Sequence, residues 1–527
     1  MATEVIWFKR DLRLRDHPPL LNAIDSAALS GQSLLPLFFV EPQRLKQPDT
    51  SEIHLHWELD CARDLDRELQ RRGSRLWILY ADPLEVFQYL HETGELTALH
   101  SHEETGTDGS FQRDRGVQKW CRKVGVDWHE TPSNGVVRRL KGRDAWKSAR
   151  DRRMRLALAD APEFIPAPPE IPSLDRWSCP ELSSLGFPER PLRDRPDPGE
   201  SSAQDVLNGF LEERGEPYRY AMSSPLSGSY HCSRLAPYLA LGCLSLRRVV
   251  QQTQQREKQL KSLRQEGRDT KRWLPSLSSF KSRLAWHCHF MQKLEMEPDL
   301  DVVAQNPIID ARMPRPLVED KFQAWSTGNT GWPFLDACMR QLHATGWINF
   351  RMRAMLMSVA SYTLWLPWRE TGLHLARLFL DYEPGIHWSQ VGMQSGTTGI
   401  NTVRAYSVTK QGRDQDPEGS YIRRWVPELA QVPADSIHEP WKMDEAEQER
   451  CQCRIGLDYP APLVDESKAR KEGVSKTYAA RRDPEARIKS QEVFQKHGSR
   501  KGPTRRRKPT KKSPKAPAAD QPGLFKE

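Results

Sequence analysis

The 527-residue sequence lacks long apolar runs and a cysteine framework. No stretch of about 18 apolar residues occurs and the mean hydropathy is −0.72, so we expect no membrane-spanning helix. The first residues lack the apolar core of a signal peptide. Nine cysteines, an odd number without regular spacing, favour reduced thiols over disulfides. These absences predict a soluble, cytoplasmic protein.

The signatures of several common enzyme sites are also missing. No P-loop is present, and no G-x-G-x-x-G motif follows the first apolar run. The Cys451-x-Cys453 pair is too sparse for a metal site, and no catalytic triad stands out. We therefore expect no metal, and a nucleotide would have to be bound in another way.

Positive charge is concentrated at the end of the chain. The formal net charge is +9, but residues 466–527 hold 19 Lys and Arg against 7 Asp and Glu, which leaves the rest slightly acidic. With few large apolar groups, residues 446–527 are predicted to form a basic, largely disordered tail. Such a tail could bind DNA phosphates by contacts that weaken with salt, or serve solubility or localisation.

Tryptophan is unusually frequent, with 17 residues. Its ring provides a flat surface for stacking, and it is also a side chain that can lose one electron. Composition alone leaves both uses open.

Short apolar runs alternate with amphipathic stretches over the first 130 residues. The apolar runs span 4–8, 34–40, 76–80 and 96–101, and helix-like stretches span 57–72 and 83–91. This alternation predicts an α/β domain with a doubly wound parallel sheet over residues 1–132. A purely structural role for this domain remains open.

The composition of the sequence changes after the predicted α/β domain. Proline recurs about every four residues between 163 and 200, so residues 133–202 are expected to be a linker or a loop that wraps the surface. From 203 to 445, apolar residues recur at helical spacing, as in 235–250, 277–296, 334–343 and 350–366. The second domain is therefore predicted to be all-α.

Two groups of polar residues stand out in the helical region. Residues 222–225 and 232–235 place small hydroxyls and one arginine just before a helix, where free N–H groups attract phosphate, although ordinary helix caps look the same. Arg351 and Arg353 lie in an apolar helix, and Asp381 and Glu383 follow a buried run. Buried charges need partners, so a purely structural ion pair is the simpler alternative.

Four segments together resemble the DNA photolyase/cryptochrome family of flavoproteins. They are WFKRDLRLRDHPPL at 7–20, CSRLAPYLALGCLS at 232–245, AWSTGNTGWPFLDACMRQLHATGWINFRMR at 324–353 and QGRDQDPEGSYIRRWVPEL at 411–429. The resemblance covers about residues 3–442. It implies an antenna-type α/β domain, a helical domain that binds FAD, and a cavity that admits a base pair flipped out of DNA.

The resemblance also implies residue roles. The residues expected to bind FAD are Tyr220, Cys232, Ser233, Arg234, Leu235, Phe280, Arg353, Asp381 and Glu383. Those expected to contact substrate DNA are Arg283, Trp286, His287, Phe350, Arg351 and Arg423. Those expected to act in catalysis are Trp286, which would stack on the pyrimidine dimer, and Trp368 and Trp388, which would relay electrons.

Several positions depart from the best-known bacterial enzymes of the family. Arg283 stands where those enzymes have a glutamate that hydrogen-bonds the dimer, and His287 where they have an arginine. Phe350 replaces an asparagine and Ala354 a methionine near the substrate. Arg315 occupies the place of the surface tryptophan of the electron relay.

The implied function is light-driven repair of cyclobutane pyrimidine dimers by an electron from excited, reduced FAD. The protein is expected to be a monomer that binds DNA containing such dimers and, if bacterial, associates with the nucleoid. The alternative is a cryptochrome-like blue-light photoreceptor without repair activity, favoured by the missing glutamate and the C-terminal extension. Repair of six-four lesions is less favoured because His287 and His289 lie two apart on a helix, on different faces. The resemblance also implies a place for a second cofactor, an antenna chromophore, which the sequence does not identify.

Overall fold

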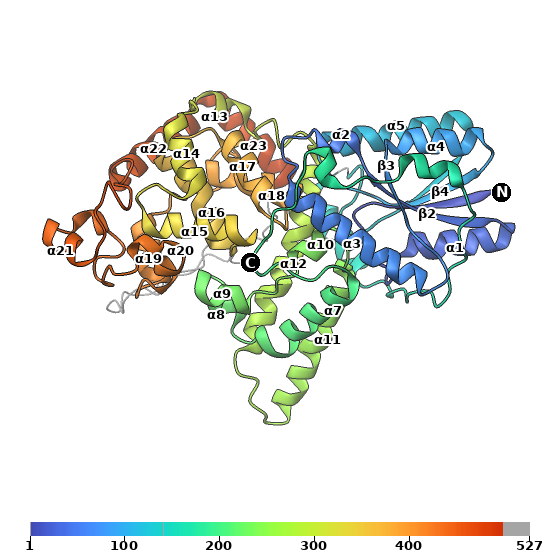
Figure 1. Ribbon diagram of the computed structural model, residues 1–527, viewed down its shortest axis with the longest axis horizontal. Helices are drawn as coiled ribbons and strands as arrows, with labels where there is room; N and C mark the ends of the chain where they lie inside the picture. Colours follow the sequence, from blue (N-terminus) through green and yellow to red (C-terminus); the bar gives the residue numbers. More distant parts are fainter. Residues whose placement is uncertain (1, 141, 499–527) are drawn as a thin grey trace.

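The computed structural model describes residues 2–140 and 142–498 as a sheet domain and a helical domain joined by a long connecting segment (Figure 1). The sheet has five parallel strands in the order β3-β2-β1-β4-β5. They are β1 (Thr3–Phe8), β2 (Ser33–Val40), β3 (Trp77–Tyr80), β4 (Leu96–His102) and β5 (Asp127–Thr131). The predicted doubly wound sheet is confirmed. Strand β5 was missed because its sequence is polar and half-exposed at the sheet edge.

Helices cover both faces of the sheet. They are α1 (Pro18–Ser30), α3 (Glu52–Gln70), α4 (Pro83–Glu92) and α5 (Asp108–Val124). Successive residues of β1 point to opposite faces: Ile6 and Phe8 join the core under α1 and α3, whereas Val5 and Trp7 join the core under α4 and α5. Because both faces are buried, β1 is apolar throughout rather than alternating.

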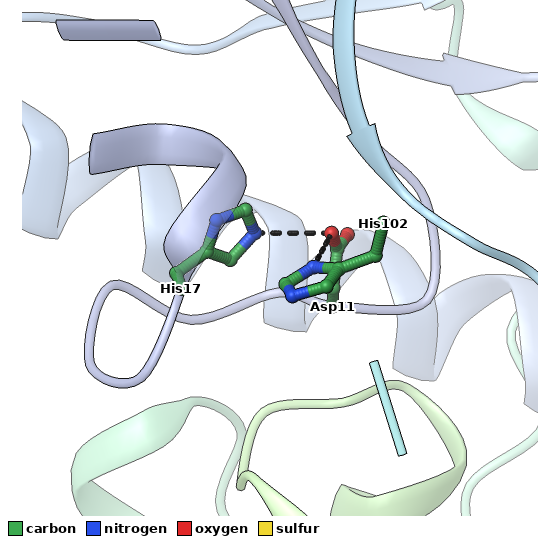
Figure 2. A group of neighbouring side chains, drawn as sticks. All are labelled: Asp11, His17 and His102. Atoms are coloured by element: carbon green, nitrogen blue, oxygen red, sulfur yellow. Dashed lines mark hydrogen bonds and ion pairs between the residues drawn. The ribbon is translucent and has the colours of Figure 1, made fainter. Parts of the chain in front are cut away.

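A buried polar cluster fixes the chain beyond the carboxyl end of β1. The Oδ2 atom of Asp11 accepts from His17 Nε2 at 3.0 Å and His102 Nδ1 at 2.7 Å, and Oδ1 accepts from the backbone N–H of Lys9 (Figure 2). Burial opposes ionisation, but the two imidazoles hold the pKa of Asp11 well below its usual range. These bonds tie β1 to α1 and β4, and they give the cluster a structural role.

The connecting segment packs over the sheet domain. It contains α6 (Trp146–Met154) and the 3₁₀ turns η2 (Pro172–Trp177) and η3 (Leu182–Leu185). Leu174 and Leu182 are buried, and Ser178 pairs with Leu79 in an isolated bridge beside β3. The proline-rich stretch therefore lies against the surface as a wrapping loop.

The helical domain begins at Glu200. Its helices up to residue 425 are α7 (Glu200–Gly209), α8 (Tyr218–Ala221), α9 (Pro225–His231), α10 (Ala236–Ala240), α11 (Leu246–Gln265), α12 (Trp273–Met296), α13 (Pro307–Ala311), α14 (Glu319–Thr327), α15 (Pro333–Thr345), α16 (Phe350–Ser358), α17 (Trp368–Leu378), α18 (Pro384–Ser395), α19 (Val408–Gln415) and α20 (Ser420–Trp425). The prediction of an all-α domain is confirmed. No helix in the described ranges is long and apolar enough to span a bilayer.

Two predicted helices differ in detail. The stretch 235–250 is broken into α10 and α11 at Gly242, which has φ +64° and packs so closely on the sheet domain that a Cβ would lie 2.2 Å from the carbonyl oxygen of Arg10. The stretch 350–366 ends early, because α16 passes into the π-helical turn η5 (Val359–Thr363). Periodicity alone does not reveal either break.

The prediction that disorder begins at residue 446 is wrong for the part of the tail that the structure describes. Three helices form there: α21 (Glu445–Arg450), α22 (Glu466–Arg481) and α23 (Pro484–His497). Many of the buried residues of α22 and α23 are small, such as Gly473, Thr477 and Ala486, and Val493 is the largest apolar one. A Cβ on Gly473 would lie 2.0 Å from the Tyr362 carbonyl oxygen, so α22 packs directly on η5. Residues 499–527 lie outside the described residues.

Candidate functional site

A loop at the start of α10 is arranged to bind an anion. Arg214 donates to the carbonyl oxygens of Tyr230 at 2.8 Å and Cys232 at 2.9 Å, so these carbonyls face Arg214. Within residues 2–140 and 142–498, the backbone N–H groups of Ser233 and Arg234 donate to no other group of the chain. Such N–H groups are typical phosphate donors.

The same loop is braced by Arg234. Its φ of +62° is rare for a residue with a side chain. Its guanidinium carbon lies 3.9 Å from the centre of the Trp347 ring, a cation–π contact that holds the strained residue in place. Leu235 is buried behind the loop. Burial raises the pKa of the neighbouring Cys232 thiol to about 12, so this residue is not a nucleophile.

Arg353 and Asp381, both predicted to bind FAD, form an ion pair in the structure. The two side chains form a two-bonded pair, with both N–O distances at 2.8 Å. Arg353 also donates from Nε to the Ile348 carbonyl at 2.7 Å and lies 4.2 Å over the Phe379 ring. The pair is therefore fixed in one orientation, as a group that borders a cofactor should be.

Glu383 has a partner that the sequence did not reveal. Its carboxylate receives bonds from Arg10 of the sheet domain at 3.0 and 3.3 Å, so it bridges the two domains. Burial raises the pKa of Glu383 to about 7, against the opposing charge of Arg10. The role of Glu383 at the polar edge of FAD stays a prediction. Its observed role is an ion pair with Arg10 that joins the two domains.

One stretch of α12 gathers four of the predicted residues. Phe280 is buried against Phe210 with ring centres 4.7 Å apart. The guanidinium carbon of Arg283 lies 4.0 Å from the centre of the half-buried Trp286 ring. His287 lines a small cavity shared with Arg10 and Glu383, and burial lowers its pKa to about 4, so the ring is neutral.

Phe350 and Arg423, both predicted to contact DNA, differ in their surroundings. Phe350 is 40% exposed, and so is Tyr220 at 58%, which was predicted to bind FAD; the two lie on neighbouring elements that Asn349 joins by donating to the carbonyls of Met222 and Ser223. Arg423 instead donates to the carbonyls of residues 418 and 432, which restrains its guanidinium. The exposed aromatics suit stacking, whereas Arg423 has a structural use.

Arg351 lies beside Phe350 at the start of α16. Its Nη1 atom reaches Gln411 Oε1 at a distance of 3.5 Å, a weak bond across to α19. This bond would be easily exchanged for a phosphate oxygen, so the prediction that Arg351 contacts DNA fits its position.

The two tryptophans predicted to relay electrons are in contact. Trp368 and Trp388 have ring centres 6.0 Å apart and an interplanar angle of 82°. Both are buried in the helical core. Arg315, at the place of the family's surface tryptophan, stacks on Trp365 at 4.7 Å. Two indoles are therefore in contact where the inner part of a relay is predicted, and an arginine stands where its outer end is expected.

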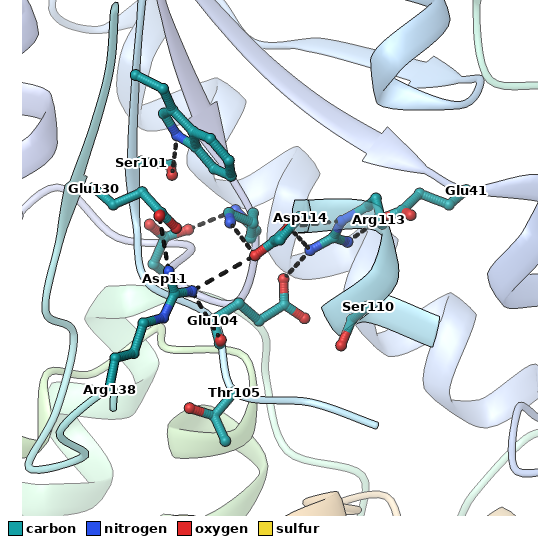
Figure 3. Close-up of polar contacts among 12 residues, drawn as sticks. Asp11, Glu41, Ser101, Glu104, Thr105, Ser110, Arg113, Asp114, Glu130 and Arg138 are labelled. Atoms are coloured by element: carbon teal, nitrogen blue, oxygen red, sulfur yellow. Dashed lines mark hydrogen bonds and ion pairs between the residues drawn. The ribbon is translucent and has the colours of Figure 1, made fainter. Parts of the chain in front are cut away.

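A cavity of about 330 Å³ lies between the two domains. It is lined by residues that follow β1 and β2, by α5, and by Leu380 and Tyr382 of the helical domain. Figure 3 shows its polar wall, where Arg113 bonds to Glu41, Glu104 and Asp114. The carboxyl ends of parallel strands are where α/β sheets bind ligands, so the cavity suits an antenna chromophore, but sequence patterns do not reveal such a volume.

The residues present fit a flavin dinucleotide. The loop at 232–235 supplies donors for its phosphates, and the Arg353–Asp381 pair supplies a fixed polar border. Two buried atoms, Oδ1 of Asn349 and Nδ1 of His287, have no hydrogen-bond partner among the described residues, as expected beside a bound polar ligand. Asn349 was not predicted, because the resemblance assigns a role only to its neighbour Phe350.

These features define a two-domain flavoprotein in which a sheet domain abuts a helical FAD-binding domain. Residues 4–142 match the family model described as DNA photolyase, and residues 280–479 match the FAD binding domain of DNA photolyase. The chain is 30% identical over 490 residues to a cryptochrome DASH of Gloeobacter violaceus, covering 88% of this chain and 93% of that protein. The chain therefore belongs to the DNA photolyase/cryptochrome family, and FAD is its cofactor.

Other relatives carry both kinds of name. A deoxyribodipyrimidine photo-lyase of Alkalihalophilus pseudofirmus is 26% identical over 500 residues, covering 90% of this chain and 97% of that protein. The fold is similar to an archaeal photolyase from Sulfolobus tokodaii with two FAD molecules, with a TM-score of 0.72, 22% identity, and coverage of 91% and 100% of the two chains. The relatives therefore include proteins named photo-lyases and proteins named cryptochromes.

Proposed function

We propose that the protein is a light-driven DNA repair enzyme, a deoxyribodipyrimidine photo-lyase that splits cyclobutane pyrimidine dimers. The observation that carries this proposal is the stacked pair of Arg283 and Trp286 on α12, 4.0 Å apart and one turn from the buried Phe280. A rigid, half-buried indole suits a base that has left the duplex, because base–aromatic stacking replaces the lost stacking in DNA.

The chain's residues would bind and orient the reacting groups. FAD, when bound, supplies after light absorption the electron that opens the cyclobutane ring and is then returned. Ser233 and Arg234 would hold its phosphates, and the Arg353–Asp381 pair would hold the polar border. Trp286 would stack on the dimer, and Arg283 would donate to a pyrimidine carbonyl or the phosphate between the bases. Phe280 and its neighbours would exclude water from the path between them.

The cavity between the domains is proposed to hold a second chromophore. Its aromatic walls include Trp7 and Phe39, and its polar wall is the Arg113 cluster. The Sulfolobus tokodaii structure, described as implicating a novel light-harvesting cofactor, supports a second chromophore in this fold. The identity of such a chromophore in this chain is left open.

A photoreceptor without repair is the second candidate. Arg283 favours it, because a guanidinium has no acceptor for the imide N–H of a pyrimidine, whereas a carboxylate has. The helices α22 and α23, docked beyond the core of the domain, could transmit a signal. The two candidates differ in whether dimer-containing DNA is recognised.

DNA binding by a Trp286→Ala variant tests the proposal. We expect affinity for dimer-containing DNA to fall by about 1–3 kcal/mol, the value of one lost stacking contact, while FAD content stays unchanged. Trp177→Ala is a matched control, because Trp177 is also half-buried beneath an arginine, Arg176, at 3.9 Å, but lies in the connecting segment. Titration of labelled duplexes with and without a dimer measures both variants.

Two results would count against repair. Equal affinity of the unaltered protein for damaged and undamaged duplexes would favour the photoreceptor. An equal loss in Trp286→Ala and Trp177→Ala would mean that the indole of Trp286 does not contact the lesion.

A further inference from the structure

The outward end of the tryptophan pair is closed to electron transfer. At the place of the family's surface tryptophan, Arg315 donates to the Ser395 carbonyl at 2.8 Å. Trp365, on which Arg315 stacks, lies against two cations: Arg315 at 4.7 Å and the ammonium of Lys476, from α22, at 5.1 Å. Positive charges beside an indole oppose the loss of an electron from it. An oxidised side chain is therefore disfavoured at this exit.

A chain of hydrogen bonds leads from Trp388 in another direction. Trp388 Nε1 donates to Tyr382 Oη at 2.9 Å, and Tyr382 Oη donates to Asp49 Oδ2 at 2.6 Å. The phenol ring is stacked on His54 with ring centres 5.6 Å apart and planes 18° from parallel. Trp388, Tyr382 and Asp49 thus connect the predicted relay in the helical domain to the sheet domain through direct contacts.

The chemistry of tyrosine sets the direction in which an electron would move along these hydrogen bonds. A phenol that loses one electron becomes a strong acid, so its oxidation is favourable only where a base takes the proton at the same time. The carboxylate of Asp49 is such a base, already within hydrogen-bond distance. Before oxidation, burial and the charge of Asp49 raise the pKa of Tyr382 well above its usual value, so the phenol keeps its proton.

The cavity between the domains opens this end of the chain to small molecules. Both Asp49 and Tyr382 line the cavity of about 330 Å³. While no second chromophore occupies the cavity, a proton on Asp49 therefore has a path to solvent, and a small reductant can reach the phenol ring. Trp368, buried in the helical core, has no comparable access.

We propose that Tyr382 is the terminal electron donor of the relay in this protein, with Asp49 as its proton acceptor. The proposal rests on the light-driven flavin chemistry proposed above. Once an electron has left Trp388 for the light-excited oxidised flavin, Trp388 takes one electron from Tyr382 while the phenol proton passes to Asp49. The products are neutral Trp388, a neutral tyrosyl radical and the acid form of Asp49.

The relay is then reset by a hydrogen-atom donor. A thiol such as dithiothreitol gives one hydrogen atom to the Tyr382 radical, which restores the phenol and leaves a thiyl radical. Asp49 returns its proton to solvent. One electron has then passed from the thiol to the flavin, and the side chains are unchanged.

Electron paramagnetic resonance of the illuminated, FAD-loaded protein tests the proposal. In the unaltered protein, a flash without thiol is expected to produce the signal of a neutral tyrosyl radical. In Tyr382→Phe, which keeps the ring, that signal is expected to be lost and replaced by a short-lived tryptophanyl signal. In Asp49→Asn, the tyrosyl radical is expected to form about a hundredfold more slowly, because a positioned base contributes at least this much.

Tyr459→Phe provides a matched control. Tyr459 is a buried residue that also donates to an aspartate, Asp336, within the helical domain. This variant is expected to keep the tyrosyl signal and its rate of formation. A tryptophanyl signal alone in the unaltered protein, or a tyrosyl signal that survives in Tyr382→Phe, would overturn the proposal.

The outcome is separable from that of the repair proposal. Dimer splitting is measured on unaltered protein that has been reduced chemically, a state that needs no relay. A protein that forms the Tyr382 radical but splits no dimers would refute repair and support the relay. A protein that splits dimers without a Tyr382 radical would do the reverse.

Discussion

At the scale of single residues, two carboxylates that are two positions apart have different partners. Asp381 forms a two-bonded pair with Arg353 inside the helical domain, whereas Glu383 reaches Arg10 in the sheet domain. The first pair is predicted to border the flavin site, and the second joins the two domains. Neither side chain would be stable in its position without its arginine, because an unpaired buried charge is costly.

The stability of the protein should report the titration of Glu383. Burial raises its pKa in the folded state to about 7 from an ordinary value of 4.5. Unfolding then releases a proton between these pH values, so the ionised form disfavours folding as pH rises. We expect the free energy of unfolding of the unaltered protein to fall relative to that of Glu383→Gln between these limits. Urea unfolding of both proteins across the range measures the difference.

Other buried acids titrate in the same range, which is why the comparison uses a difference. Burial also raises the pKa of Glu295 to about 7 and of Asp301 to about 6. Their contributions are common to both proteins and cancel. Parallel stability curves for the two proteins would show that Glu383 stays ionised throughout, held by Arg10.

At the scale of secondary-structure elements, the site depends on helices that approach one another closely. Helix α12 presents Phe280, Arg283 and Trp286 on adjoining turns, and α18 carries Trp388. The C-terminal helix α22 packs on the π-helical turn η5 beside these elements. A helix that the sequence suggested would be disordered is thus part of the support of the relay region.

Gly473→Ala should displace α22. The added Cβ would lie 2.0 Å from the Tyr362 carbonyl oxygen, which is backbone and cannot move aside alone. We expect a loss of about 1–3 kcal/mol, as for other overpacked interiors, and faster cleavage of the chain near α22 by added protease. Ser475→Ala, at an exposed position of the same helix, is the control and should change neither quantity. Unchanged protease resistance in Gly473→Ala would contradict this packing.

At the scale of the whole molecule, positive charge is concentrated near the end of the sequence. Residues 499–527 contain 10 Lys and Arg and 2 Asp and Glu, whereas residues 1–465 are slightly acidic. Attraction to DNA phosphates would therefore come chiefly from the end of the chain. Residues of the described domains that are predicted to contact DNA, such as the exposed Phe350, would then supply recognition of the lesion.

Deletion of residues 499–527 should flatten the salt dependence of DNA binding. Each phosphate contact made by a lysine or arginine releases counterions, so fewer contacts give a smaller slope of log affinity against log salt. FAD content should not change, because the described FAD-site residues end well before this segment. Fluorescence titration at several salt concentrations measures the slope, and a slope equal to that of the full chain would exclude the segment from DNA binding.

Much of the fold could be predicted from the sequence because its signals are local. Four of the five strands contain short apolar runs, and α12 and α15 carry apolar residues at helical spacing. The docking of α22 could not be predicted, since it depends on close contact by small residues such as Gly473. Small residues bury little area and give no periodic apolar signal.

The site shows the same division. The pairing of Arg353 with Asp381 was implied by the family resemblance, whereas the need of buried charges for partners predicted only that some arginine and acid of this region would pair. The pairing of Glu383 with Arg10 and the contact of Tyr382 with Asp49 could not be predicted, because each joins segments more than 300 residues apart. Their positions are set by how the two domains pack, which no local pattern encodes.

The most direct test of the account is illumination of the reduced, purified protein with an oligonucleotide that contains a pyrimidine dimer. Splitting of the dimer restores the ultraviolet absorbance of the two pyrimidines. We expect this absorbance to recover under blue light and to stay constant in the dark. No recovery from a protein that carries its full complement of reduced FAD would contradict the account and favour a photoreceptor.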